Sequence, residues 1–260
     1  MELSAFLVGE DRAASVTVVG PDAVPMANVF GPDIGFALRK LFESKGVSFH
    51  LGASVQEIKG DDKGSVSSVL LSDGAALDAD VVVVGIGVTP ATGFLSESGV
   101  ALDERGFVAV DDCMKAEGAD DVYACGDIAK FPLACFDLPS VNVQHWQMAF
   151  KHGRQAALAI MGKAKPLDTV PFFFSVAFGS TIRYAGYGVG FDEVVIHGDL
   201  EELKFVAYYF KEGVLRAVAT RMRDPVAAQI ADCFRLRKTI TKADVDQNEN
   251  DDWKHLLAAA

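Results

Sequence analysis

The chain has 260 residues, of which 50% are hydrophobic, so it is long enough for one large or two ordinary domains with a sizeable core. Its formal net charge is −12, with 24 lysine and arginine residues against 36 aspartate and glutamate residues, which argues against a protein that binds nucleic acid through a basic face. No apolar run reaches the length of a membrane span, and the four cysteines show no metal-binding spacing, so we expect reduced thiols, no transmembrane segment and no metal centre.

Helices and strands are predicted to alternate over the first part of the chain. In chain order, hydrophobic spacing predicts a helix over 1–8, a buried strand over 16–19, a helix over 31–44, a strand over 47–51 and a strand pair over 55–58 and 66–71. A run of valines over 78–85 then predicts a strand covered on both faces. This alternation is typical of a doubly wound parallel sheet, here one without its first strand.

The alternating pattern continues to about residue 162 and then changes. Up to that point we expect a short helix over 94–98, strands over 107–110 and 122–125, and a long helix over 143–161. Beyond it we expect strands over 172–178, 181–187, 193–197, 203–211 and 214–220, followed by a helix over 223–235. The clearest hairpin turn is Glu212-Gly213, and the acidic residues 244–252 are expected to form a frayed tail.

A glycine and an aspartate follow the strand that is predicted over 122–125. In open α/β sheets, ligands bind beyond the carboxyl ends of the strands, and Gly126 would let a ligand approach the backbone closely. The carboxylate of Asp127 could accept hydrogen bonds from the hydroxyls of a sugar or polyol. An ordinary strand-end turn is the alternative, because Gly-Asp is a common turn pair.

Two further segments have the composition of a ligand site. Gly85 and Gly87 follow the valine run and would leave room for a flat ring or a pyrophosphate, although a tight connection between two domains is the alternative. His145 and Trp146 open the long helix, whose N-terminus carries a partial positive charge that suits an anionic ring edge. Taken alone, Trp146 is more often a core anchor and His145 a helix cap.

Three consecutive phenylalanines stand at 172–174. They cannot all face one side of a strand, so at least one should point toward a ligand or another domain. The sequence contains no Ser–His–Asp set, H-E-x-x-H motif, P-loop or iron–sulfur cysteine cluster, and we therefore name no catalytic side chain. The paired acids at 61–62 and 111–112 are interpreted as solvated surface.

In this order, the segments resemble the pyridine nucleotide-disulphide oxidoreductase family, in its ferredoxin-reductase and apoptosis-inducing-factor-like branch. Residues 84–95 are similar to the family's crossover from the NADH domain to the FAD domain, and residues 121–127 are similar to its second FAD motif. Residues 141–149 are similar to its flavin-edge helix. Residues 171–175 and 183–188 are similar to the start of its C-terminal domain. The segment 198–207 is most similar to a mitochondrion-associated group within that branch.

The resemblance implies FAD and NADH as cofactors, with NADPH left open. It implies that Gly126 and Asp127 contact the ribityl chain or phosphates of FAD. Trp146 and the backbone at His145 would flank the isoalloxazine, and Phe174 stands where relatives usually have a tryptophan over the flavin.

On the NADH side, Glu2 matches the family's glutamate that faces the nicotinamide, and Gly85 and Gly87 line the NADH cleft. The sequence departs from the family at Gly20, where relatives place an acidic residue for the ribose hydroxyls. The glycine loop of the NADH domain, the N-terminal half of the FAD domain and an amino-terminal iron–sulfur domain are expected to be missing. The resemblance therefore implies an N-terminally truncated member, with the electron acceptor an iron–sulfur domain or protein.

The expected fold class is α/β, with incomplete FAD/NAD(P)-binding doubly wound sheets followed by an α+β C-terminal reductase domain. The expected domains are an NADH-binding domain over 1–84, the C-terminal part of an FAD-binding domain over 85–163, an α+β interface domain over 164–245 and an acidic tail over 246–260. The resemblance implies a location in the mitochondrion or the cytoplasm, and it leaves a homodimer open.

The expected function is that of an FAD-dependent NAD(P)H oxidoreductase, in which hydride passes from NADH to flavin and electrons then pass to the acceptor. The first alternative is a non-catalytic interaction or dimerisation fragment, because FAD phosphates are held by backbone N–H groups at a glycine loop that the sequence does not contain. The second alternative is an NADH-binding regulatory domain without flavin. A flavoprotein is yellow as purified, so the colour of the purified protein distinguishes the oxidoreductase from the two alternatives.

Overall fold

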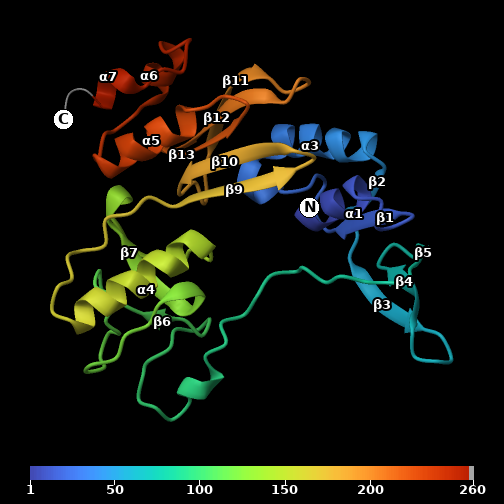
Figure 1. The fold of residues 1–260 in the computed structure, drawn as a ribbon, viewed down its shortest axis with the longest axis horizontal. Coiled ribbons are helices and arrows are strands. Elements are labelled where there is room, and N and C mark those ends of the chain that lie inside the picture. The colour runs from blue at the N-terminus through green and yellow to red at the C-terminus, as the bar shows by residue number, and fades with distance from the viewer. Residues whose placement is uncertain (258–260) are drawn as a thin grey trace. The chain divides into compact units, whose positions relative to one another are not determined.

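The computed structural model describes residues 1–257, which have a mixed α/β fold, as the sequence predicts. The chain divides into two compact units. The first unit contains Met1–Gly87 together with Ser175–Thr181 and Asp199–Lys204, and the second contains the remaining residues. Figure 1 shows the elements of both units with the labels used below.

A small parallel sheet and its helices open the first unit. These elements are α1 (Glu2–Gly9), β1 (Val16–Gly20), α2 (Ala27–Phe30), α3 (Pro32–Ser44) and β2 (Val47–Leu51). β1 and β2 pair in parallel, and α3 buries Leu38 and Phe42 about one turn apart. The Phe42 ring meets the Phe178 ring edge-on, with 4.9 Å between centroids. The predicted order of helices and strands is confirmed, but β1 is only partly buried because one strand alone pairs with it among the described residues.

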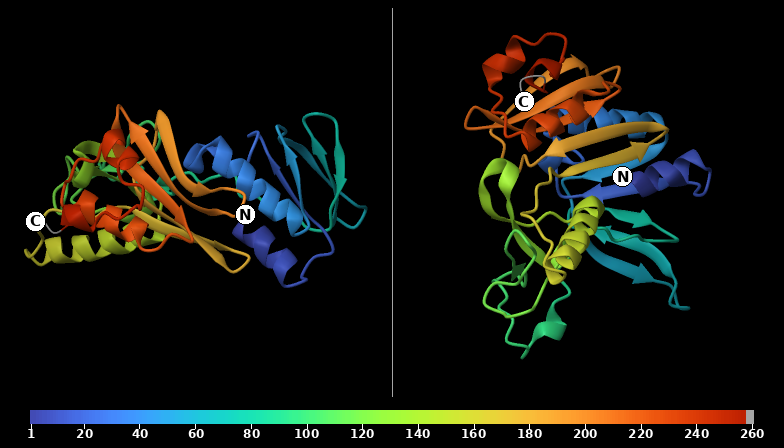
Figure 2. Two further views of the ribbon diagram at one scale, coloured as in Figure 1. Left: turned by 90° about the horizontal axis from the view of Figure 1, so that it is seen from above. Right: turned by 60° about the vertical axis from the view of Figure 1, so that its left-hand side comes forward.

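A three-stranded antiparallel ribbon completes the first unit. Its strands are β3 (Val55–Gly60), β4 (Val66–Leu71) and β5 (Ala76–Asp78), and the pairing of the first two confirms the predicted hairpin. The Asp61 carboxylate accepts the N–H groups of Lys63 and Ser65, both at 2.9 Å, and thereby closes the turn between them. Figure 2 shows the three antiparallel strands, in blue-green, from two further directions.

The valine run after β5 is not the buried strand that its composition predicts. Residues 79–92 contain no helix or strand, and Val81 and Val83 are 78% and 65% exposed. A parallel strand exists only where neighbouring strands accept and donate its backbone hydrogen bonds. No described strand pairs with this segment, and most of its apolar side chains remain exposed, although Val82 packs against the cluster of Ala53, Val69 and Leu71.

The second unit begins with short elements around a three-stranded sheet. They are η1 (Gly93–Leu95), β6 (Val108–Ala109), η2 (Gly126–Ile128), β7 (Ala129–Leu133), η3 (Ala134–Phe136), β8 (Leu138–Val141) and the long helix α4 (Trp146–Ile160). β7 pairs in parallel with β6 and antiparallel with β8, a hairpin that the sequence pattern did not predict. The strand predicted over 122–125 is wrong, because among the described residues this segment forms only the bridge from Lys115 to Tyr123.

A five-stranded sheet with strand order β11-β12-β13-β10-β9 carries the largest core. Its strands are β9 (Phe172–Ala177), β10 (Ser180–Gly186), β11 (Glu193–Asp199), β12 (Lys204–Lys211) and β13 (Val214–Arg221), and α5 (Val226–Arg235) packs against β13. Figure 1 shows these strands in orange beside the helix. All five predicted strands, the helix and the hairpin turn are confirmed, and Glu212 and Gly213 have positive φ angles of 53° and 75°.

The acidic C-terminal segment is ordered, and the expected frayed tail is therefore wrong for the described residues. It contains α6 (Lys242–Asp246) and α7 (Lys254–Leu257), and Trp253 is fully buried. Asp251, only 1% exposed, accepts hydrogen bonds from Tyr208 at 2.8 Å and from Arg223, and lies 2.7 Å from the ring of His197. A buried aromatic anchor and a paired carboxylate hold the segment in place, while residues 258–260 lie outside the described part.

Candidate functional site

The loop at η2 presents a carboxylate that no other side chain uses. Gly126 has a φ of +77°, a conformation that glycine adopts readily, and Asp127 follows it with an exposed side chain. A Cβ atom on Gly126 would lie 3.7 Å from the Cβ of Ala149, so α4 passes directly beside the loop. Among residues 1–257, no hydrogen bond or ion pair involves the Asp127 carboxylate, which leaves it available to a ligand.

Two side chains hold the backbone of this loop from different elements. The Asn142 amide donates hydrogen bonds to the carbonyl oxygens of Asp127 and Ala129, at 2.9 and 2.8 Å. The Gly126 N–H donates to Nδ1 of His152 in α4, at 3.3 Å. The loop is therefore fixed through its main chain, and the carboxylate of Asp127 is the part that remains free.

The N-terminus of α4 places an aromatic ring in solvent. Trp146 is the first residue of the helix and is 91% exposed, so it is not the core anchor that a lone tryptophan usually is. His145 precedes it and packs edge-on against the Phe173 ring, with 4.9 Å between centroids. Burial lowers the pKa of His145, and its buried Nδ1 atom has no hydrogen-bond partner among the described residues.

The phenylalanine run at the start of β9 lies beside this helix terminus. The Phe172 N–H donates to the side chain of Gln147 at 3.1 Å, and Phe173 stacks on Tyr184, with 5.1 Å between centroids. Phe174 is instead 65% exposed, which confirms that one ring of the run points away from the core. Asp127, Trp146 and Phe174 thus lie on elements that contact one another within one unit.

The residues expected on the NADH side belong to the first unit. Glu2 begins α1, and its carboxylate accepts the N–H of Val176 at 3.3 Å. Gly85 and Gly87 are exposed, and a Cβ atom on either would meet nothing within 4 Å. Each of these residues is open to solvent, and each keeps its role as a prediction.

The residues of the second unit fit a flavin. An exposed carboxylate suits the hydroxyls of a ribityl chain, and exposed aromatic rings suit a flat ring system. The unpartnered Nδ1 of His145 is a buried polar atom, and such atoms normally have a partner. A polar ligand edge at the start of α4 would supply one.

Asn142 and His152 are site residues that the motifs did not reveal. Each acts on the backbone of a residue 13 or more positions earlier, so no local sequence pattern marks it. A cavity of about 390 Å³ also lies next to Asn142, lined by Asp103, Arg105, Lys130, Ser140, Gln144 and Tyr187. Asp127 does not line this cavity, and we assign the cavity no role.

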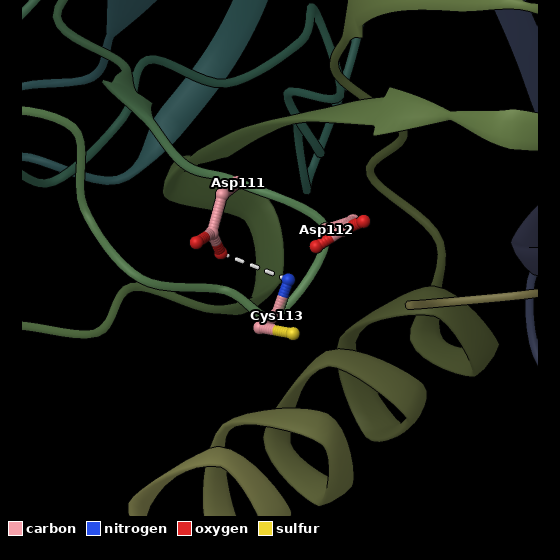
Figure 3. A group of neighbouring side chains, drawn as sticks. All are labelled: Asp111, Asp112 and Cys113. Atoms are coloured by element: carbon pink, nitrogen blue, oxygen red, sulfur yellow. Dashed lines mark hydrogen bonds between the residues drawn. The ribbon is translucent and has the colours of Figure 1, made fainter. Parts of the chain in front are cut away.

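A second group of polar side chains, at 111–113, has no features of a metal site beyond proximity. Figure 3 shows Asp111, Asp112 and Cys113, in which Asp111 accepts the Cys113 N–H at 2.8 Å. Asp111 also accepts the N–H of Lys115, so its carboxylate closes a turn. Burial raises the pKa of the Cys113 thiol and keeps it protonated, which disfavours metal binding.

The fold is that of a family of oxidoreductases. The model of the family described as pyridine nucleotide-disulphide oxidoreductase matches residues 1–153, and the chain belongs to that family. It is 42% identical over 246 residues to apoptosis-inducing factor 3 of Homo sapiens, covering 95% of this chain and 40% of that relative. It is 36% identical to a peroxisomal monodehydroascorbate reductase of Oryza sativa subsp. japonica, covering 83% of this chain and 45% of the relative.

Solved structures show the same fold. The ferredoxin reductase for the CYP199A2 system from Rhodopseudomonas palustris matches with a TM-score of 0.86 and 29% identity, covering 99% of this chain and 61% of that one. Putidaredoxin reductase, in its covalent complex with putidaredoxin, matches in fold with a TM-score of 0.87 at 24% identity, covering 99% of this chain and 60% of that one. The chain spans about 40% of the length of the apoptosis-inducing factor 3 relatives. None of the helices within residues 1–257 has the length and apolarity that crossing a membrane requires.

Proposed function

We propose that this chain is part of an FAD-dependent NAD(P)H oxidoreductase and that its second unit holds the ribityl chain and ring edge of the flavin. The observation that carries the proposal is the free, exposed carboxylate of Asp127 on a loop whose backbone is fixed by Asn142 and His152. The exposed rings of Trp146 and Phe174 on adjoining elements support it, as does membership of the family.

In this proposal the flavin, when bound, supplies the chemistry by accepting a hydride and releasing electrons one at a time. The chain binds and orients it: Asp127 accepts hydroxyl hydrogen bonds, and the α4 N-terminus at His145 and Trp146 directs partial positive charge at the ring edge. Phe174 would cover the ring and exclude water. Glu2, Gly85 and Gly87 are the residues proposed to contact NADH or NADPH.

Partners and location follow from the same proposal. The electron acceptor is proposed to be an iron–sulfur domain or protein, and the location to be the mitochondrion or the cytoplasm. Similarity to a ferredoxin reductase supports the proposed acceptor, whereas the location rests on the resemblance of the sequence alone. A homodimer is compatible with both.

The proposed contacts set the affinity that this chain can reach. Asp127 would add one or two hydrogen bonds to FAD, each stabilising the complex by about 1–3 kcal/mol. Nanomolar affinity requires about 12 kcal/mol. We therefore expect the 260-residue chain to bind FAD reversibly, with a Kd no tighter than the micromolar range.

A flavin titration tests the proposal directly. FAD is added to the purified chain, and its visible absorption and fluorescence are followed, with riboflavin-free buffer and an unrelated acidic protein as blanks. A resolved, saturable change in the flavin spectrum supports the proposal, and NADH reduction under anaerobic conditions is then measured. A spectrum that stays identical to free FAD up to millimolar concentration contradicts flavin binding by this chain.

A non-catalytic interaction module is the second candidate. The observation that favours it is a row of exposed apolar side chains on α4, formed by Trp146, Phe150 and Ile160. Such rows usually face a partner. Charged substitution of Phe150 separates the two candidates, because an interaction module would lose association, whereas a flavin site formed by Asp127, Trp146 and Phe174 would keep its affinity for FAD.

A further inference from the structure

We propose that His152 is a positioning residue, which accepts the Gly126 N–H and thereby sets the direction in which the Asp127 carboxylate meets the flavin. The inference rests on the proposed function for its ligand and on the structure for its geometry. His152 lies on α4, while the loop that it holds lies at η2, 26 residues earlier in the chain.

The side chain of His152 is completely buried, with 0% of its surface exposed. One face of the ring packs with the Phe131 ring, whose centroid is 4.3 Å away in an edge-to-face arrangement. Its only hydrogen bond among the described residues is the one from Gly126, at 3.3 Å. The ring therefore has a fixed place between the β7 strand and the loop.

The direction of this hydrogen bond defines the state of the ring. Nδ1 accepts a hydrogen bond from the Gly126 N–H, so the neutral tautomer carries its hydrogen on Nε2. Burial lowers the pKa of His152 to about 4, against the opposing effect of the Asp127 charge. Protonation at Nδ1 would remove the acceptor, and the ring stays neutral near pH 7.

Packing alone does not account for a histidine at this position. The Nε2 atom is buried without a partner among the described residues, which is a cost that leucine would avoid at similar volume. What histidine provides is an acceptor for a backbone N–H in a loop with positive φ at Gly126. Asn142 holds the carbonyl oxygen of Asp127, so the two side chains together fix the peptide group before Gly126 and the peptide group after Asp127.

Two variants of the full chain test the inference. In His152→Asn the side-chain oxygen occupies nearly the position of Nδ1 and can still accept the Gly126 N–H, whereas His152→Leu fills the space without an acceptor. Amide hydrogen exchange at Gly126, measured by NMR without ligand, reports the hydrogen bond itself. The histidine ring nitrogen shifts in the wild-type protein report the tautomer, with hydrogen on Nε2.

The expected result is faster Gly126 exchange in His152→Leu, by about tenfold or more, and near wild-type exchange in His152→Asn. In the same samples, FAD affinity should fall about tenfold in the leucine variant and recover in the asparagine variant. A thermal melt of each variant confirms that the fold is retained.

The hydrogen-exchange measurement and the FAD titration test the inference and the proposed function separately. If the wild-type chain does not bind FAD, the proposed function fails for this chain, and the exchange of Gly126 alone decides whether His152 holds the loop. Unchanged exchange at Gly126 in His152→Leu overturns the inference. Changed exchange with unchanged FAD affinity also overturns it, because His152 would then hold the loop without directing the ligand.

Discussion

At the scale of single residues, Asp127 and Asp251 are carboxylates in two contrasting environments. Asp127 is exposed on a loop whose main chain is fixed, so its position is defined although its side chain has no partner among the described residues. Asp251 is buried and makes contacts with three side chains. The first arrangement suits recognition of a ligand and the second suits stability.

Replacement of Asp127 by alanine should lower FAD affinity with little effect on folding. The carboxylate has no hydrogen-bond or ion-pair partner among residues 1–257, so its loss removes only the proposed hydrogen bonds to the ribityl hydroxyls. Loss of one such bond, worth about 1–3 kcal/mol, weakens the Kd by about fivefold to 150-fold. Flavin fluorescence titration measures the change. The matched control is Asp62→Ala, which removes the same charge from an exposed turn, and an equal loss in both variants would point to net charge as the cause.

Stability should decrease with acidification because His152 is buried as a neutral ring. Its pKa is about 4 in the folded chain and 6.5 in a solvated histidine, so between these values the unfolded chain binds more protons than the folded one. Stability is therefore fully present above pH 6.5 and falls as pH drops toward 4. The contribution lost by pH 5 is on the order of 2 kcal/mol.

Urea unfolding at pH 8 and pH 5 measures this dependence. The His152→Asn variant has no titrating group at that position. Between pH 8 and pH 5, its free energy of unfolding should therefore decrease by about 2 kcal/mol less than that of the wild-type protein. A slope that is the same in both proteins would mean that other groups cause the pH dependence.

Asp251→Asn should destabilise the second unit by about 3 kcal/mol, since it leaves the Arg223 guanidinium without its counter-charge next to a buried site. The hydrogen bond from Tyr208 would persist only in a weaker, neutral form. Denaturant midpoints measure the loss. Glu249→Gln, an exposed substitution in the same segment, should leave the midpoint unchanged.

At the scale of secondary structure, the five-stranded sheet depends on one glycine where two strands and a helix meet. Gly186 in β10 has a φ of +105°, and a Cβ atom there would overlap the carbonyl oxygen of Arg216 and lie 2.8 Å from the Phe234 ring. Gly186→Ala should therefore cost several kcal/mol, combining backbone strain with a clash that the core cannot relieve.

Gly179→Ala is the control for that substitution. Gly179 also has a positive φ, of 73°, but a Cβ atom there would meet nothing within 4 Å, so only the backbone cost of about 1–2 kcal/mol remains. Thermal unfolding of the two variants separates strain from steric overlap. Equal losses of stability in the two variants would show that the sheet moves to accommodate the methyl group at Gly186.

The elements that the sequence predicts well are those whose partners stand next to them in the chain. The strands β9 to β13 alternate or run apolar between turn signals, and each hairpin turn joins neighbours, as at Glu212 and Gly213. The segments 78–85 and 122–125 have equally strong strand composition, but composition does not specify a partner, and no described strand pairs with the first of them. Residue propensity therefore predicts that these two segments are extended, but it does not predict whether they are buried.

Some residues of the candidate site could be predicted from the sequence, and others could not. Gly126, Asp127 and Trp146 stand in recognisable local patterns, and the structure presents the carboxylate and the indole ring to solvent. His152 had no such signal, because a helical histidine that accepts a distant backbone N–H looks like any other polar residue in a helix. Contacts of this kind become visible only when the two elements are seen together.

At the scale of the whole molecule, a net charge of −12 keeps chains apart, while a stretch of exposed apolar residues draws them together. The stretch at 81–88 includes Val83 and Ile86, which is 90% exposed, on a backbone that makes no strand pairing among the described residues. An unpaired extended segment of this composition can pair with another chain. We therefore expect concentration-dependent self-association through this segment.

A double variant, Val83→Lys with Ile86→Lys, should weaken that association by about a hundredfold or more, because burial of each apolar side chain contributes about 1.5–3 kcal/mol. Sedimentation velocity over a range of protein concentrations measures the change. The charge-matched control is Thr89→Lys with Ala91→Lys, which adds the same two charges at exposed positions a few residues further on. If both double variants weaken association equally, the effect is electrostatic repulsion. If neither does, the contact lies elsewhere, and the exposed side of α4, with Trp146 and Phe150, becomes the surface to test.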